Sequence, residues 1–246
     1  MVVVTTERPR VFTGAARIRF ADEEGGLVQL NGLPPLPAAR SYTSAAQALA
    51  AGRRTRGALH AAGIDADFGP VFDTSDGPLG SREFRSSSYA TAFARGLGDA
   101  ACAKHFPGLG SAAYSTDDRP HVDAHVRPQD LAPYRQAIRS GLRCVMVGNA
   151  FYGTRYRASL EPGTYRRLRA LGFKGIAITD SLSLIHAAPV ERWARQAIRA
   201  GADMVLFASP AMARRAIAAL VPLARRGELD AHVARILRYR GAISRR

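Results

Sequence analysis

Short apolar runs alternate along the chain with longer stretches in which apolar residues recur every three or four positions. The short runs are bounded by Gly, Pro and charged residues, which is typical of strands. Because the runs are almost continuously apolar, they indicate parallel strands buried on both faces. The predicted strands occupy residues 16–22, 66–73, 101–106, 143–149, 175–180 and 202–208.

The stretches between the strands have helical periodicity. In VERWARQAIRAG, for example, Val190, Trp193 and Ala197 share one face, and Gly201 follows the last turn. The alternation of strand and helix indicates an α/β protein with a parallel sheet. The predicted helices span about residues 43–62, 88–98, 130–140, 162–171, 188–200, 210–225 and 229–239.

Polar or ionisable residues stand at the ends of several predicted strands. In parallel sheets, closed or open, the carboxyl ends of the strands carry the functional site. A single Asp after a strand is commonly a helix N-cap or a turn former, but several such groups at one rim call for a functional explanation. The residues concerned are Asp22, Asp73, Lys104, His105, Asn149 and Asp180.

Composition adds few constraints. The 246 residues, 47% hydrophobic and 22% charged, fit one domain over residues 1–246, with no boundary that would divide it. The formal charge is +15, and only Lys104 and Lys174 are lysines. Because the arginines are scattered and no long basic run is interleaved with aromatic residues, we expect solvated helix faces and no nucleic-acid partner. A nucleic-acid-associated protein is the alternative that the charge alone favours.

The two cysteines, Cys102 and Cys144, both lie in apolar runs and in no metal-ligand spacing. We therefore expect buried free thiols rather than a disulfide. No apolar stretch approaches the roughly 20 residues of a membrane span. The opening segment MVVVTTERPR has no basic region followed by a long apolar one, so we expect a cytoplasmic protein.

A distinctive motif, KHFPGLG, begins at Lys104 and ends the apolar run 101–106. The Phe-Pro-Gly segment 106–108 bends the backbone directly after the predicted strand. Adjacent residues on a strand point to opposite faces, so Lys104 and His105 need special local geometry to reach one ligand together. Otherwise one of them points into the rim and the other packs beneath it.

This motif resembles the K-H-F-P-G-x-G signature of glycoside hydrolase family 3, in its β-N-acetylhexosaminidase branch. Further segments resemble family motifs in the same order over about residues 17–208, which is far more specific than any one motif. On this basis the chain is identified as a member. The segments are DEEGG (22–26), DFGPVFD (67–73), LGSREF (79–84), VMVGNAFY (145–152), LGFKGIAITDSLSL (171–184) and AGADMVLF (200–207).

The resemblance implies a (β/α)8 TIM-type barrel that hydrolyses terminal β-linked N-acetylhexosamine with retention of configuration. It implies a carbohydrate substrate, cell-wall-derived amino sugars among them, and neither a cofactor nor a metal. Only six strands are clear, with a further candidate in MVVVTT, so we expect a barrel that is incomplete at its N-terminus.

The family pattern also implies roles for individual residues. Asp180 matches the nucleophile that forms the glycosyl-enzyme. Four residues match positions that hold the sugar ring through charged hydrogen bonds to its hydroxyl groups. These are Asp22, Arg82, Lys104 and His105.

The acid/base position departs from the family. The branch carries an Asp-x-His pair after its K-H-F-P-G-H-G motif, and counting on from Gly110 those places hold Ser115 and Asp117. Asp117 is then the candidate acid/base, with Asp118 as a substitute. The alternative is that both aspartates only cap or solvate the loop.

Three further differences bear on activity. Leu109 replaces the second histidine of the motif, Ser181 replaces the second Asp of the family's D-D-L segment, and Leu30 stands where an Arg is common. They favour altered specificity or weak activity. A second hypothesis is a catalytically impaired barrel that binds sugar or a protein partner without turnover; it is favoured by the lost His and its lost Asp partner, by the short N-terminus and by a shortened region between Arg82 and Lys104. The spacing of His121, Asp123 and His125 also allows metal ligation, although a loop favours surface histidines.

Overall fold

The computed structural model describes residues 2–5, 11–14, 18–73, 77–184 and 189–244. Several ends of predicted elements, residues 1, 6, 16, 17 and 188, lie outside these ranges. The strands are β1 (Val2–Thr5), β2 (Val11–Gly14), β3 (Arg19–Ala21), β4 (Ala66–Asp67), β5 (Cys102–Phe106), β6 (Cys144–Val147), β7 (Ile176–Ser181) and β8 (Met204–Phe207).

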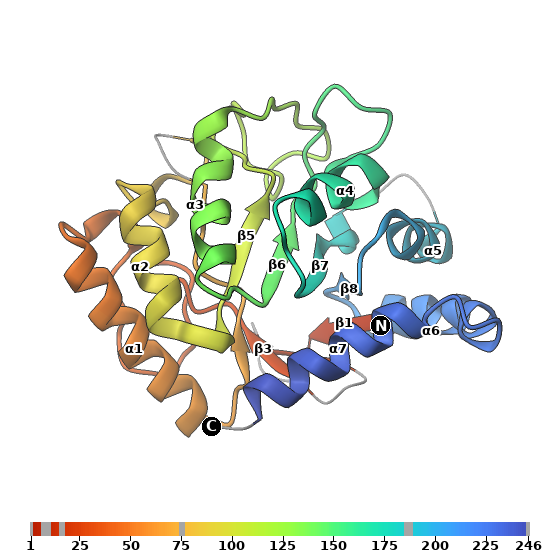
Figure 1. Cartoon of the computed structure of the whole chain (residues 1–246), viewed down its shortest axis with the longest axis horizontal. Coiled ribbons are helices and arrows are strands. Elements are labelled where there is room, and N and C mark those ends of the chain that lie inside the picture. Colours follow the sequence, from red (N-terminus) through yellow and green to blue (C-terminus); the bar gives the residue numbers. More distant parts are fainter. Residues whose placement is uncertain (1, 6–10, 15–17, 74–76, 185–188, 245–246) are drawn as a thin grey trace.

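The helices surround these strands on the outside (Figure 1). They are α1 (Ala45–Ala61), α2 (Ser87–Leu97), α3 (Pro128–Arg139), α4 (Pro162–Ala170), α5 (Val190–Ala200), α6 (Pro210–Arg225) and α7 (Asp230–Ile243). Short 3-10 turns lie between them: η1 (Ala39–Ser41), η2 (Gly80–Arg82), η3 (Gly98–Ala100), η4 (Ala158–Leu160) and η5 (Leu182–Leu184).

Every predicted strand and helix has a counterpart at its expected place. The helices begin where the sequence offers caps: the Ser44 side chain accepts a hydrogen bond from the backbone N of Gln47, and Ser209 does the same for Met212. At the other end of α5, Gly201 adopts a φ of +127°, a region that favours glycine. Local signals therefore position the helices.

The eight strands form one sheet in the order β4-β3-β2-β1-β8-β7-β6-β5. The pairs β3–β4, β5–β6, β6–β7, β7–β8 and β8–β1 are parallel. Parallel bridges join Asp67 to Ala101 and Val71 to Lys104, so the two outer strands of this order meet and the sheet closes into a ring. The α/β prediction is confirmed.

The N-terminal part differs from the expectation. β1 lies in the MVVVTT segment and pairs with β8, so the sequence does supply a strand there. β2 was not predicted, and it runs antiparallel to both β1 and β3. The ring of described strands therefore has eight members, and the expected gap at its N-terminus is absent from it. It departs from a uniform (β/α)8 pattern at β2, which is antiparallel to its neighbours.

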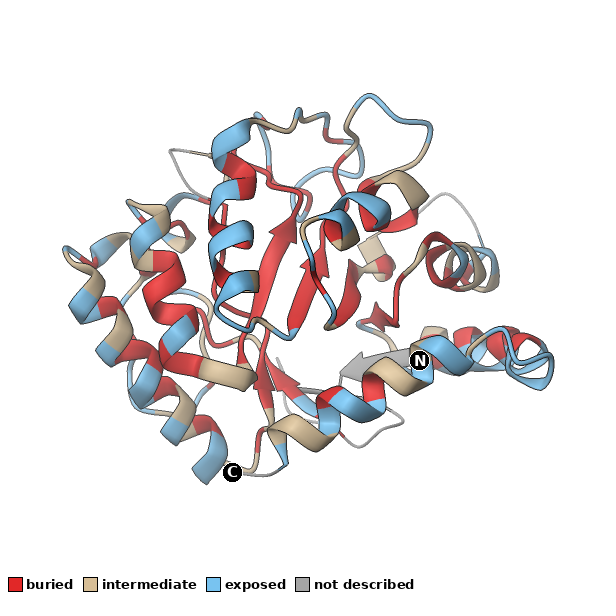
Figure 2. Ribbon diagram, in the orientation of Figure 1, coloured by how far each residue is buried: buried red, intermediate tan, exposed pale blue. Residues whose placement is uncertain are grey.

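The interior of the ring is apolar and closed at one end. Phe20 and Phe68 stack inside it with ring centroids 4.6 Å apart, and Ile236 and Tyr239 of α7 join the same buried cluster. α7 thus covers the N-terminal ends of the strands. In Figure 2 this helix runs beneath the buried strands at the centre of the view. The opposite end is left for the functional groups.

Cys102 and Cys144 correct the expectation of free thiols. They are partners in the register between β5 and β6, and a disulfide joins them. The prediction rested on their apolar surroundings, which are indeed fully buried. Apolar context does not reveal which two residues become neighbours across a parallel sheet.

No helix in the described part of the chain is long and apolar enough to span a membrane. This agrees with the absence of any long apolar run from the sequence.

Candidate active site

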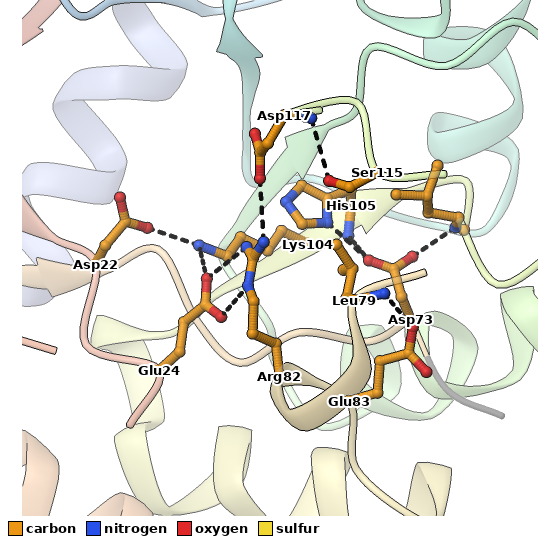
Figure 3. Close-up of polar contacts among 12 residues, drawn as sticks. Asp22, Glu24, Asp73, Leu79, Arg82, Glu83, Lys104, His105, Ser115 and Asp117 are labelled. Carbon is orange, nitrogen blue, oxygen red and sulfur yellow. Dashed lines mark hydrogen bonds and ion pairs between the residues drawn. The ribbon is translucent and has the colours of Figure 1, made fainter. Parts of the chain in front are cut away.

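Lys104 lies at the carboxyl end of β5 between two carboxylates (Figure 3). Its Nζ is 2.6 Å from Asp22 Oδ1 and 2.6 Å from Glu24 Oε1, and the side chain is almost fully buried. Burial lowers the pKa of Lys104, but Asp22 and Glu24 outweigh it and raise that pKa above its usual value. Lys104 is therefore a fixed ammonium group.

Arg82 shares Glu24 with Lys104. Its Nε and Nη2 donate to the two oxygens of Glu24 at 2.7 and 2.8 Å, a bidentate pair. Burial raises the pKa of Glu24, but Lys104 and Arg82 together lower it to about 2. Sequence reasoning missed Glu24, although it lies within the DEEGG motif. The convergence of two cations on this buried carboxylate becomes visible only in three dimensions.

His105 is held by Asp73, which follows the bridge at Val71. Asp73 Oδ2 lies 2.7 Å from His105 Nδ1 and accepts the His105 backbone N–H at 3.0 Å, while its Oδ1 accepts the Leu109 backbone N–H at 2.6 Å. Burial lowers the pKa of His105, but Asp73 outweighs this and raises it. With Nδ1 facing the carboxylate, Nε2 is the ring atom left for a ligand.

Both members of the KH pair are thus buried and both bind groups of the same rim. The strand is irregular at this point: the Lys104–His105 peptide is cis, and the register with β6 shifts between Ala103 and Phe106. The alternative in which one side chain only packs beneath the rim is not what the structure contains.

Asp180 lies near the end of β7 and is 8% exposed. Its Oδ1 accepts the backbone N–H of Ser181 at 2.6 Å. Burial raises the pKa of Asp180 above its usual value, and Asp117 adds to this rise; the charges of His105 and Lys104 oppose it without cancelling it. Asp180 thus interacts electrostatically with the cationic pair and with Asp117.

The two candidate acid/base residues are not equivalent. Asp117 Oδ2 is 3.1 Å from Arg82 Nη1, and about half of its side chain (52%) is exposed. Asp118 is exposed, and within the described residues its side chain makes no hydrogen bond or ion pair; only its backbone N–H bonds to Ser115. The structure therefore brings Asp117, and not Asp118, to the other site residues.

The loop that carries Asp117 is fastened to the loop after β6. The backbone of Phe151 exchanges 2.8 Å hydrogen bonds with Val122 and Ala124, and the His121 ring stacks on Phe151 at 4.3 Å. His121 also meets Asp123 at 3.2 Å, but the described residues contain no group of three ligands that could hold a metal. These histidines belong to the loop's own structure.

Two more residues after β6 complete the rim. The Asn149 amide donates to the Ser181 carbonyl at 3.0 Å and accepts from Ser159, so it braces the end of β7. Arg157 donates a hydrogen bond to the Pro120 carbonyl at 3.1 Å. Burial lowers the pKa of Arg157, and the negative charge of Asp180 partly opposes this by raising it. Arg157 is thus a further cation near Asp180, and no sequence motif marked it.

Comparison with known proteins matches this sequence and fold to one family. The model of the glycosyl hydrolase family 3 N terminal domain covers residues 12–239. The chain belongs to this family. The resemblance seen in the motifs is therefore confirmed.

Its family relatives include enzymes named for their activity. A protein of Stenotrophomonas maltophilia named beta-hexosaminidase is 31% identical, with 81% of this chain and 69% of that protein covered. A family 3 glycosyl hydrolase of Mycobacterium smegmatis has a structure with a TM-score of 0.80 at 30% identity, covering 91% of this chain and 78% of that one. NagZ from Neisseria gonorrhoeae, solved in complex with N-trifluoroacetyl-D-glucosamine, gives 0.71 at 29% identity, covering 80% and 67%. The family 3 relatives thus share the barrel, and each extends beyond the part matched here.

Proposed function

We propose that this family 3 domain is a retaining exo-glycosidase that removes terminal β-linked N-acetylhexosamine. The observation that carries the proposal is the buried Asp180 carboxyl group at the end of β7, within the electrostatic field of Lys104 and His105. Burial leaves the pKa of Asp180 above its usual value. The cations beside it oppose that effect and favour the ionised, nucleophilic form. The relative solved with an N-acylated glucosamine supports this class of sugar, and cell-wall-derived amino sugars fall within it.

The sugar would be bound by the polar residues around Asp180. Asp22, Lys104 and Arg82 already form a charged hydrogen-bond network that fixes each side chain before substrate arrives. Such prearranged groups orient the sugar hydroxyls at low entropic cost. His105, oriented by Asp73, adds Nε2 to this set.

The reaction would proceed in two displacements. An Asp180 oxygen forms a bond to the anomeric carbon as the bond to the leaving oxygen breaks, and Asp117 gives its proton to that oxygen. A water molecule then loses a proton to Asp117 and attacks the anomeric carbon. The bond to Asp180 breaks, its carboxylate is regenerated, and the configuration is retained.

A specific observation favours the alternative of binding without turnover. The Asp-His pair of the family is replaced by Ser115 and Asp117, and Asp117 is bonded to Arg82 at 3.1 Å. To act as the acid, Asp117 must exchange this contact for the leaving oxygen. If it does not, the same site would hold a sugar but would not cleave it.

The test compares three variants on a chromogenic β-N-acetylglucosaminide. We expect Asp180→Asn to lose more than about 10⁴-fold in turnover and Asp117→Asn to lose about 10²- to 10⁴-fold. Asp118→Asn is the matched control and should keep wild-type activity. Asp118 is adjacent in sequence, but Asp117 is the residue that contacts Arg82.

Azide separates the roles of the two carboxylates. With an activated substrate, azide should restore turnover to Asp117→Ala and give a β-glycosyl azide, since azide needs no general base; Asp180→Ala should not respond in this way. A wild-type protein that is thermally stabilised by N-acetylglucosamine but never turns over would establish the alternative.

A further inference from the structure

A cavity lies at the opposite end of the ring from Asp180. It has a volume of about 650 Å³. Arg19 begins β3, Asp65 directly precedes β4, and η3, with Asp99, directly precedes β5, so the cavity opens at the N-terminal ends of the strands. In Figure 1 the C-terminal end of α7 lies beside the end of α1 here, and Ile243 shares the cavity wall with α1.

Three cationic or titratable side chains of α1 line this cavity. Arg53, Arg56 and His60 are spaced i, i+3 and i+7, which places them on one face of the helix. None of them has an ion-pair partner among the residues that the structure describes. Like charges one helical turn apart repel one another, so an anion between them would be stabilising.

Arg19 faces the same space from β3. Gly63 has a φ of +69°, and a Cβ added to it would lie 3.1 Å from Arg19 Nη2. A glycine at the turn after α1 therefore lets the guanidinium lie against this turn. Arg19, Arg53 and Arg56 thus approach the cavity from two different elements.

The two acids in the wall are already engaged elsewhere. Asp65 Oδ2 accepts the backbone N–H of Arg19 at 2.7 Å. Asp99 Oδ1 pairs with Arg143 Nε at 2.8 Å. In the described part of the chain, neither carboxylate forms an ion pair with Arg53, Arg56 or His60.

We propose that this cavity binds a phosphorylated small molecule. Arginine presents a planar fork of donors that matches phosphate oxygens, and two or three such forks suit a di- or triphosphate. The volume falls in the range of about 300–1,000 Å³ that is usual for small-molecule sites. Ile243 and Ile64 add apolar wall for an attached ring. The site is separate from the proposed glycosidase site and does not depend on it.

The experiment measures binding of pyrophosphate and of magnesium-free ATP by calorimetry in about 150 mM salt, where unspecific surface attraction is screened. Wild-type protein and Asp180→Asn should bind equally. The double variant Arg53→Gln/Arg56→Gln should bind at least about tenfold more weakly.

The matched control is Arg214→Gln/Arg225→Gln on α6. It removes the same two charges from exposed positions that lie outside the cavity wall. It should bind as wild type, and all variants should unfold at the wild-type temperature. Absence of binding at millimolar probe, or equal weakening in both double variants, would overturn the proposal.

Discussion

Glu24 joins two of the sugar-binding residues predicted from the motifs, Lys104 and Arg82. Its side chain is buried, with the residue 5% exposed. One carboxylate oxygen pairs with Lys104, and both oxygens accept hydrogen bonds from Arg82. Lys104, which is buried, and Arg82, which is partly buried, therefore share this carboxylate. This arrangement makes Glu24 a positioning residue for the sugar-binding side chains, and it couples the site to the stability of the fold.

Glu24→Gln should destabilise the protein by about 3–5 kcal/mol, because it removes the buried carboxylate charge that Lys104 and Arg82 share. Urea unfolding measures the change. Glu191→Gln breaks an exposed pair with Arg215 and is the control, with no measurable effect expected. If Glu24→Gln unfolded at the same urea concentration as Glu191→Gln, Lys104 and Arg82 would not need the Glu24 charge, and the prediction would be wrong.

The same residue predicts how stability depends on pH. The pKa of Glu24 is lowered from 4.5 to about 2, so its contribution is fully present above pH 4.5. It should be lost as the pH falls from there towards 2. The Gln variant, compared with wild type over this interval, should show a smaller loss of unfolding free energy.

Asp73 predicts a pH effect on the activity proposed above. It raises the pKa of His105 against the effect of burial, so His105 keeps its proton further above pH 6.5 than a free histidine. Asp73→Asn should lower that pKa, and any alkaline limb due to His105 should move to lower pH. The profile of kcat/KM with pH is the measurement, and Asp123→Asn, on the exposed loop, is the control. An unchanged limb would assign it to another group.

At this scale the sequence was informative where a motif existed. Asp180, Lys104 and His105 were predicted from their motifs, and the structure brings them together. Glu24 and Arg157 were missed, because their importance comes from partners distant in sequence: Glu24 meets Arg82 across 58 positions. Charge pairing over such distances leaves no local pattern.

Among the elements, α7 is attached to the ring by a buried acid. Asp203, directly before β8, is fully buried; its Oδ1 lies 3.0 Å from His232 Nδ1 and 2.7 Å from Arg235 Nε, both on α7. Its Oδ2 accepts from Arg169 of α4 and from the Ala177 backbone, at 2.9 Å each. Burial raises the pKa of Asp203, but these partners outweigh it and lower it.

Asp203→Asn should therefore cost about 3–5 kcal/mol and loosen α7. Hydrogen exchange should show faster exchange of α7 amides than of α2 amides. Asp230→Asn in the exposed first turn of α7 should cost less than about 1 kcal/mol, the value of a helix-dipole interaction. Equal protection of α7 in both variants would contradict the attachment.

The elements themselves were predictable to different degrees. The helices follow from caps and apolar periodicity, which are local. β2, at residues 11–14, was missed, since four residues between β1 and β3 carry too little pattern. Its direction also depends on pairing with both neighbours, which only the assembled sheet defines.

For the molecule as a whole, ring closure depends on contacts between distant segments. The bridges of Asp67 to Ala101 and Val71 to Lys104 join the two outer strands of the pairing order. Family resemblance predicted a barrel, but composition and periodicity could not distinguish it from an open parallel sheet. The closed ring places β5 beside both the β4 segment and β6, so the strand of Lys104 is fixed from two sides.

The Cys102–Cys144 disulfide adds a covalent link at this same place. It joins β5 to β6 and closes a loop of 42 positions, which corresponds to about 4 kcal/mol of stability through restriction of the unfolded chain. Alkylation of unreduced, denatured protein should therefore label neither cysteine, and prior reduction should expose both. Cys102→Ala/Cys144→Ala should unfold at lower urea, and wild type in reductant should approach it. If both thiols react without reduction, the cysteines are free, and the stability of the β5–β6 pair has to come from hydrogen bonds and packing alone.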